Sequence, residues 1–138
     1  MRVFVTGGTG FIGSIVVEEL IGKGHQVLGL ARSDKTEQAL NAAGAEVLRG
    51  ELEDMAILKH GAAQADGVIH LGFSSDFSRY NEEVAMDLAA VQAIGAALEG
   101  TGRPFVNTAG TLGMSGLWCT ATASDNPPDD LTHGASEW

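Results

Sequence analysis

The sequence predicts an α/β fold, a doubly wound parallel sheet of about five strands in the order 3-2-1-4-5. Short apolar runs alternate with segments of helical periodicity along residues 1–108, which is typical of strand–helix–strand units. A glycine-rich turn separates the first apolar run from the first helical segment. Because such units are right-handed in nearly all cases, we expect the second strand to lie parallel to the first, with the fourth on the first strand's other side.

Chain length and cysteine content bound the architecture. At 138 residues the chain can form one domain that buries roughly two thirds of its unfolded surface, but not a second sizeable one. We therefore expect a single domain over residues 1–138, in which 109–138 form an irregular active-site loop and the start of a further helix. The single cysteine, Cys119, excludes an internal disulfide framework and favours a reducing, cytoplasmic setting.

Charge and hydropathy narrow the possible partners. The formal net charge of -10 opposes a nucleic-acid partner, because binding a phosphate backbone requires clustered Lys and Arg, and only eight are spread through this chain. The N-terminus enters a strand at once, without a long apolar run, so we expect neither a signal peptide nor a membrane contact. A small-molecule substrate remains the expected partner.

The first strand and helix are the clearest elements. Residues 3–5 form an apolar run of β-favouring residues that stops at a cluster of glycines, as a buried parallel strand would. The helical pattern starts directly afterwards. Its apolar side chains predict a buried face made of Ile12, Ile15, Val16 and Leu20.

The turn between this strand and helix reads TGGTGFIG, residues 6–13. A diphosphate needs a tight turn, a backbone without Cβ where the anion approaches, close helix packing, and the free N–H groups of a helix start. Gly7, Gly10 and Gly13 supply these positions as GxxGxxG, and Gly8 completes the GxGxxG alternative. Since the motif follows a strand and opens a helix, it predicts a dinucleotide site, with a ligand-free turn as the alternative.

The motif TGGTGFIG resembles the phosphate loop of the extended and atypical short-chain dehydrogenase/reductases, a group of NAD(P)-dependent epimerases, dehydratases and reductases with a Rossmann fold. The resemblance runs from residue 1 to about residue 137 and is strongest in the first thirty. It implies an NAD(P) cofactor. The loop residues that would contact it are Gly7, Gly10, Phe11, Ile12 and Gly13.

The remaining elements follow from the same patterns. We expect strands at residues 26–31, 46–49, 67–72 and 104–108, and helices at 55–63 and 80–99. Asp34 and Glu37 have the spacing of a capping box, which predicts a helix that Gly44 ends. The fifth strand would leave a bare sheet edge, so we expect a homodimer through that edge, a tendency to aggregate, or a missing C-terminal part.

The end of the second strand predicts which nicotinamide cofactor fits. An acid there binds the ribose 2′-hydroxyl of NAD, whereas an arginine accommodates the 2′-phosphate of NADP. Here Ala31 is followed by Arg32 and Ser33, so NADP(H) is favoured, with NAD(H) as the alternative. Arg32 could instead be a solvated side chain, with Asp34 as its partner or as a ribose contact.

Two further segments would complete the cofactor site by resemblance. Glu51 and Leu52 stand where relatives carry an Asp and an apolar residue against the adenine. Gly72 and Phe73 follow a strand that resembles the VIHLA strand of the family, so they inherit the contact with the nicotinamide ribose. His70 lies inside that strand and is expected to be a packed core histidine rather than a catalyst.

The catalytic residues that the resemblance implies are only partly present. Family members carry a Ser or Thr at the end of strand five and a Tyr–Lys pair on the next helix. Thr108 stands in the place of the hydroxyl, with Thr111 next to it in rank. The only tyrosine, Tyr80, lies on the wrong helix, and His133 occupies the expected Tyr position. A histidine can exchange protons near neutral pH, but Glu137 cannot supply the charge of the missing lysine.

Two functions therefore remain open. The first is an NADP(H)-binding oxidoreductase-like protein that acts on a carbonyl or hydroxyl of a small molecule. The second is a non-catalytic dinucleotide-binding module that senses redox state or regulates a partner, which the missing Tyr–Lys pair favours. No residue of this sequence selects a particular substrate.

Overall fold

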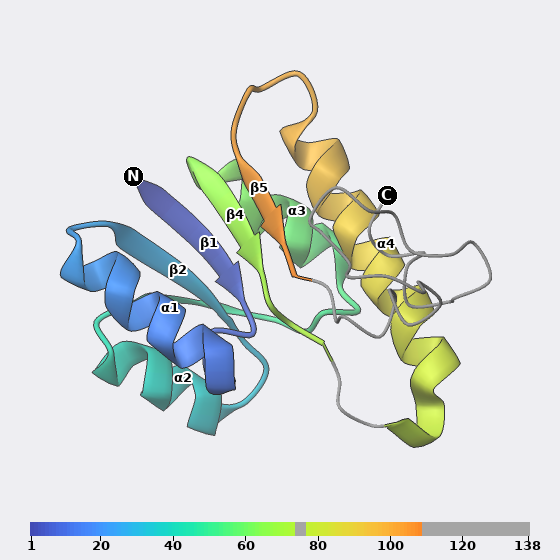
Figure 1. The fold of residues 1–138 in the computed structure, drawn as a ribbon, viewed down its shortest axis with the longest axis horizontal. Helices are drawn as coiled ribbons and strands as arrows, with labels where there is room; N and C mark the ends of the chain where they lie inside the picture. Colours follow the sequence, from blue (N-terminus) through green and yellow to red (C-terminus); the bar gives the residue numbers. More distant parts are fainter. Residues whose placement is uncertain (74–76, 109–138) are drawn as a thin grey trace, which may run out of the picture.

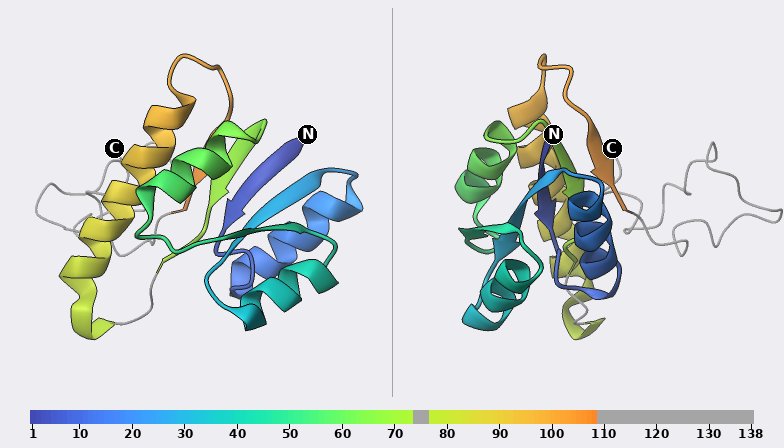
Figure 2. Two further views of the ribbon diagram at one scale, coloured as in Figure 1. Left: turned by 180° about the vertical axis from the view of Figure 1, so that it is seen from behind. Right: turned by 90° about the vertical axis from the view of Figure 1, so that its left-hand side faces the viewer.

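The computed structural model describes residues 1–73 and 77–108. A parallel sheet in the order β3-β2-β1-β4-β5 carries helices on both faces, which confirms the expected fold class and strand order (Figures 1 and 2). Its elements in chain order are β1 (Arg2–Thr6), α1 (Phe11–Gly22), β2 (Gln26–Ala31), α2 (Asp34–Ala42), β3 (Glu46–Arg49), α3 (Met55–Ala63), β4 (Gly67–His70), a 3₁₀ turn (Phe77–Arg79), α4 (Tyr80–Leu98) and β5 (Phe105–Asn107).

Strand β1 is the centre of the sheet because it pairs on both sides. Val3 is opposite Val27 of β2 and Gly67 of β4, and both neighbours run parallel to it. From Val3 to Thr6 every residue is buried, as the apolar run predicts for a strand covered on both faces. The order of the strands changes direction between β1 and β4, so a crevice is expected at their carboxyl ends.

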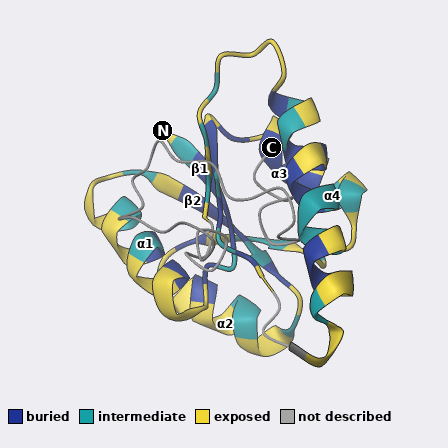
Figure 3. Ribbon diagram, turned by 45° about the vertical axis from the view of Figure 1, so that its right-hand side comes forward, coloured by how far each residue is buried: buried dark blue, intermediate teal, exposed yellow. Residues whose placement is uncertain are grey.

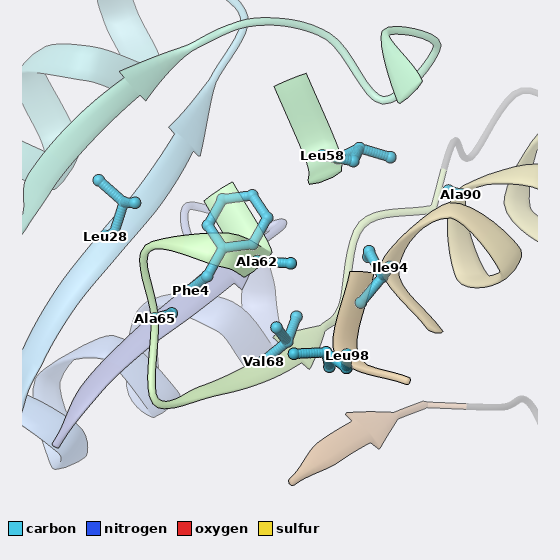
Figure 4. Packing of buried hydrophobic residues seen from close by; sticks show 9 residues of the cluster. All are labelled: Phe4, Leu28, Leu58, Ala62, Ala65, Val68, Ala90, Ile94 and Leu98. Atoms are coloured by element: carbon cyan, nitrogen blue, oxygen red, sulfur yellow. The ribbon is translucent and has the colours of Figure 1, made fainter. Parts of the chain in front are cut away.

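Two apolar clusters cover the two faces of the sheet. On one face Phe4 is fully buried among side chains of α3 and α4, which pack against each other (Figure 4). On the other face Val5 packs with Val17 of α1 and Leu40 of α2. Burying one such side chain contributes about 1.5–3 kcal/mol, so both layers of helices are held by the same central strand.

The predicted buried face of α1 is right in part: Leu20 packs against the core and Val16 is half-buried, but the other two residues of that face are not buried. Ile12 and Ile15 are 54% and 56% exposed, whereas Gly13 and Val17 are buried (Figure 3). A Cβ atom at residue 13 would collide with the carbonyl oxygen of Gly7, so the glycine side of the helix faces the turn. That contact brings this side of α1 toward the sheet, while Ile12 and Ile15 of the first turns are left exposed.

The start of α2 also differs from the prediction. The capping residue is Ser33, whose hydroxyl accepts the Thr36 N–H at 3.3 Å, while the Ser33 N–H donates to the Thr36 hydroxyl at 3.1 Å. The expected Asp34–Glu37 box is therefore displaced by one residue at each end. Gly44 ends this region with a φ of 86°, a left-handed conformation that suits glycine, as predicted.

The other element bounds agree with the sequence within a few residues. Strand β4 ends at His70 rather than at residue 72, because the next two residues leave the sheet to line a cleft. The irregular region expected at 109–138 lies outside the described residues. Within the described part of the chain, no helix is both long and apolar enough to cross a membrane.

Gly61 of α3 and Gly95 of α4 provide a matched test of this packing, because both helices cover the same face of the sheet. A Cβ atom at Gly61 would stand 2.5 Å from the ring of Phe4, whereas at Gly95 it would meet nothing within 4 Å. Replacing either glycine by alanine raises helix propensity by about 1 kcal/mol. We expect Gly61→Ala to lower the free energy of unfolding by about 1–3 kcal/mol through overpacking, and Gly95→Ala to raise it slightly. Urea unfolding measures both, and equal effects would contradict the packing.

Candidate functional site

A cleft of about 520 Å³ lies where the strands end, next to the point at which the strand order changes direction. Its volume is in the usual range for a small-molecule site, and its position is where open α/β sheets bind ligands. The residues that line it come from the glycine turn and from the ends of β2, β3 and β4: Gly7, Thr9, Gly10, Leu30, Arg32, Thr36, Gly50, Leu52, Leu71, Gly72 and Phe73.

The three glycines of the turn meet different constraints. Gly7 has a φ of +68°, and a Cβ there would stand 2.6 Å from the carbonyl group of Leu71. A Cβ at Gly13 would collide with the Gly7 carbonyl. The fold therefore needs glycine at both positions. Gly10 has a φ of −74°, and its Cβ would lie 3.3 Å from the Gly7 oxygen, a contact that a small shift relieves. The fold therefore tolerates a small side chain at Gly10, which lines the cleft, better than at Gly7 or Gly13.

The start of α1 is available to an anion. Gly10 is its N-cap residue, and no side chain of the described residues caps it. By contrast, Ser33 caps α2 and Asp54 caps α3, each through a side-chain oxygen. The first N–H groups of a helix have no partner within the helix and carry its positive dipole end. Glycine at the cap leaves the start of α1 able to bind a phosphate group.

Arg32 is the one charged residue among those lining the described cleft. It follows β2 and is exposed, and within residues 1–73 and 77–108 no acid pairs with it. Asp34, the alternative partner that the sequence offered, bonds instead to Arg49 at 3.2 Å, and Glu37 bonds to the same nitrogen at 3.0 Å. A cation with no acidic partner in the part of the chain that the structure describes therefore lines the cleft of an acidic protein.

The structure brings together most of the predicted cofactor residues, but not all of them. Leu52, Gly72 and Phe73 line the same cleft as Gly7, Gly10 and Arg32. Several predicted residues lie close in sequence but outside the lining: Phe11 and Ile12 are exposed on the first turn of α1, Gly13 packs on the turn, Ser33 caps α2, and Glu51 is exposed in the turn before α3.

The predicted catalytic residues are not assembled in the described structure. Thr108 is exposed just beyond β5, and its N–H donates to Asn107 Oδ1 at 3.0 Å. Thr111, His133 and Glu137 lie outside the described residues. His70 is buried, as expected for a core histidine, and it is hydrogen-bonded to Thr6 and Asp87. In the described ranges no group of three His, Cys, Asp or Glu side chains could hold a metal ion.

Sequence reasoning missed five lining residues. Thr9 lies inside the glycine motif and Thr36 lies in the first turn of α2, so the sequence positions of both could have indicated that they line the cleft. The other three lie at or directly after the ends of β2, β3 and β4: Leu30, Gly50 and Leu71. Thr6 and His70 are 64 residues apart, and His70 and Asp87 are 17 apart, so no local pattern indicated that they touch.

Comparison with known proteins assigns the family. Residues 3–108 match the model of the NAD dependent epimerase/dehydratase family. The chain belongs to this family. The expected resemblance to NAD(P)-dependent epimerases and dehydratases is thereby confirmed, together with the cleft's position at the strand ends.

Individual members are similar over different lengths. The uncharacterized protein YLL056C of Saccharomyces cerevisiae is 47% identical over 116 residues, 83% of this chain and 39% of the yeast protein. A 4-hydroxy-2-methyl-3-oxo-4-farnesyl-3,4-dihydroquinoline-1-oxide ketoreductase of Stigmatella aurantiaca is 40% identical over 70 residues, 51% of this chain and 21% of that protein. This chain thus spans well under half the length of these relatives.

Among solved structures, the Bordetella bronchiseptica enzyme WbmG in complex with NAD has the same fold. Its TM-score is 0.79 at 22% identity, and the match covers 99% of this chain and 46% of WbmG. At this level of identity the likeness supports the fold alone. Proteins with this fold therefore include one bound to NAD.

Two glycine variants separate the demands of the fold from those of a ligand. We expect Gly13→Ala to lower the free energy of unfolding by about 2–4 kcal/mol, because its methyl group meets the backbone of Gly7 and Gly8. We expect Gly10→Ala to stay within about 1 kcal/mol of the natural protein but to lose roughly tenfold or more in NAD(P)H affinity. Urea unfolding and fluorescence titration measure the two quantities. Unchanged cofactor affinity in Gly10→Ala would count against a diphosphate at the turn.

Proposed function

We propose that this chain is the NADP(H)-binding part of an oxidoreductase that acts on a carbonyl or hydroxyl group of a small molecule. The observation that carries the proposal is the cleft itself. In it the glycine turn, the start of α1 without a side-chain cap, and Arg32, which no acid of residues 1–73 and 77–108 pairs with, come together. These are the groups that a diphosphate and a further phosphate require.

The residues at the turn fit the diphosphate. Gly7 and Gly10 expose backbone where an anion approaches, and the absent side chain of Gly10 leaves space that the fold does not need. The first N–H groups of α1 are donors without a side-chain competitor. Thr9 and Thr36 add hydroxyl groups to the cleft wall. A cleft with donors and a single cation suits an anionic ligand.

The preference for NADP(H) rests on Arg32 and on its surroundings. A guanidinium at the end of β2 can donate paired hydrogen bonds to a 2′-phosphate. Ala31, which precedes it, offers no carboxylate to a ribose hydroxyl or against a phosphate. The nearby carboxylates of Asp34 and Glu37 are engaged by Arg49, so they do not compete for Arg32. NAD(H) is the alternative cofactor.

The reaction class is supported by the family and by one relative. Bound NADP(H) supplies or accepts a hydride at its nicotinamide ring. The Stigmatella aurantiaca relative is named a ketoreductase, which acts on a carbonyl group. In this chain the Thr108 hydroxyl would orient the substrate oxygen, and His133 would exchange its proton. Both roles remain proposals, as does the substrate.

A second function has its own support. The chain carries no tyrosine followed four residues later by lysine, and a carboxylate, Glu137, stands where the lysine would be. A protein that binds the dinucleotide without this pair could sense the redox state of the NADP pool rather than turn over a substrate. Its binding site would be the same cleft, so only activity separates the two functions.

Cofactor preference gives the first test. We expect NADPH to bind about ten- to a hundredfold more tightly than NADH, because the 2′-phosphate gains a charge-assisted bond to Arg32. Arg32→Ala should remove most of that preference. Lys23→Ala, which removes the same charge at the far end of α1, should leave it unchanged. Fluorescence titration measures the six affinities, those of the natural protein and of each variant for NADPH and for NADH. NADH binding at least as tightly to the natural protein would overturn the preference.

Turnover gives the second test. The purified protein is mixed with NADPH and a panel of small carbonyl compounds, and loss of NADPH absorbance is followed. An enzyme should lose its turnover in Thr108→Ala and His133→Ala with little change in NADPH affinity, while Thr108→Ser should retain activity because the hydroxyl is kept. Tight NADPH binding with no turnover across the panel would favour the sensor.

A further inference from the structure

A buried network of hydrogen-bonded polar side chains lies next to one wall of the cleft. The hydroxyl of Thr6, at the end of β1, lies 2.7 Å from Nδ1 of His70 on β4. Nε2 of the same imidazole lies 3.1 Å from a carboxylate oxygen of Asp87 on α4. Thr6 is fully buried, His70 is 2% exposed, and the Asp87 side chain is 11% exposed. Polar groups are costly to bury, so this buried network of side chains needs a physical explanation.

The chemistry of these groups sets the direction of each hydrogen bond. An ionised carboxylate can only accept, so in the arrangement with Asp87 ionised His70 donates its Nε2–H to Asp87. In a neutral imidazole the other nitrogen then accepts, so Nδ1 accepts the hydroxyl proton of Thr6. The lone pairs of the Thr6 hydroxyl remain free to accept, and the N–H of Gly72 donates to it at 3.1 Å. Asp87 therefore acts on Gly72 through two intermediate side chains.

The same threonine joins the two loops that form the cleft. Its carbonyl oxygen accepts the N–H of Leu71 at 3.2 Å, and its hydroxyl accepts the N–H of Gly72. The next residue, Gly7, approaches this segment so closely that a Cβ would stand 2.6 Å from the Leu71 carbonyl group. Gly72 and Phe73 then line the cleft beyond this point. The orientation of the Thr6 side chain is therefore linked directly to the position of that wall.

We propose that Thr6, His70 and Asp87 are positioning residues that hold the Gly72–Phe73 wall for the nicotinamide half of the dinucleotide. The inference rests on the proposed binding of NADP(H), with Arg32 at one side of the cleft and Gly72 at another. None of the three side chains touches the cofactor in this account. They act by fixing the backbone of Gly72, which a rotating threonine hydroxyl could not do without His70.

Two ligands separate positioning from a general loss of structure. NADPH spans the whole cleft, whereas adenosine 2′,5′-bisphosphate carries only the adenosine half with its phosphates. Thr6→Val keeps the shape of the side chain but removes the acceptor of Gly72 and the donor to His70. We expect it to weaken NADPH binding roughly tenfold and to change bisphosphate binding less than about twofold. Thr6→Ser, which keeps the hydroxyl, should restore NADPH binding.

Each outcome of this experiment decides something. Equal losses for the two ligands in Thr6→Val, or no loss for either, would overturn the positioning role while leaving NADP(H) binding intact. If the natural protein bound neither ligand, the proposed function would fail and this inference with it. Should Thr6→Val not fold, Asp87→Ala provides the same comparison, because Asp87 is the least buried residue of the three. We then expect the same difference between the losses of NADPH affinity and of bisphosphate affinity.

The direction of the hydrogen bonds has an independent readout. Nitrogen-15 spectra of labelled histidine distinguish the two neutral tautomers, and a His70→Gln variant assigns the signals. We expect His70 to carry its proton on Nε2 in the natural protein and to populate both tautomers in Asp87→Ala, because the acceptor that selects one is gone. A proton on Nδ1 of His70 in the natural protein would contradict the arrangement.

Discussion

Gly13 lies so close to the carbonyl group of Gly7 that a Cβ atom at residue 13 would collide with the Gly7 oxygen. This contact brings the start of α1 onto the glycine turn and sets the rotation of the helix about its axis. Val17 then points into the core, while Ile12 and Ile15 point out of it. The same contact places the start of the helix, which has no side-chain cap among the described residues, beside the cleft, so both the packing of α1 and the shape of the cleft depend on one close approach.

The distribution of charge around the cleft follows from the strand ends. The protein carries a formal net charge of -10, yet the one charged side chain among the described lining residues is a cation, Arg32. Strand β3 ends at Arg49, directly beside Ala31 of β2, where its guanidinium reaches Asp34 and Glu37. Exposed ion pairs of this kind add little stability. These ion pairs matter instead because they engage the carboxylates of Asp34 and Glu37, which therefore do not pair with Arg32.

The sequence was informative wherever one segment determines its own structure. The strands at 26–31 and 46–49, the helix at 55–63 and the helix end at Gly44 agree with the structure, because apolar runs and glycine stops act locally. The two wrong predictions, part of the buried face of α1 and the cap of α2, each depend on one specific contact. The buried face of α1 depends on Gly13 meeting Gly7, and the cap of α2 depends on which hydroxyl reaches the helix start. Neither contact is visible in hydrophobic periodicity.

By itself the sequence determined the fold class, the strand order and the position of the glycine turn between β1 and α1, because each rests on short-range patterns and on the handedness of strand–helix–strand units. Only the tertiary structure decided that Asp34 and Glu37 pair with Arg49, so that no acid of the described residues pairs with Arg32, and that Thr6, His70 and Asp87 form one buried hydrogen-bonded network. These residues come from separate strands and helices. Their contacts exist only once the sheet has brought the ends of those elements together.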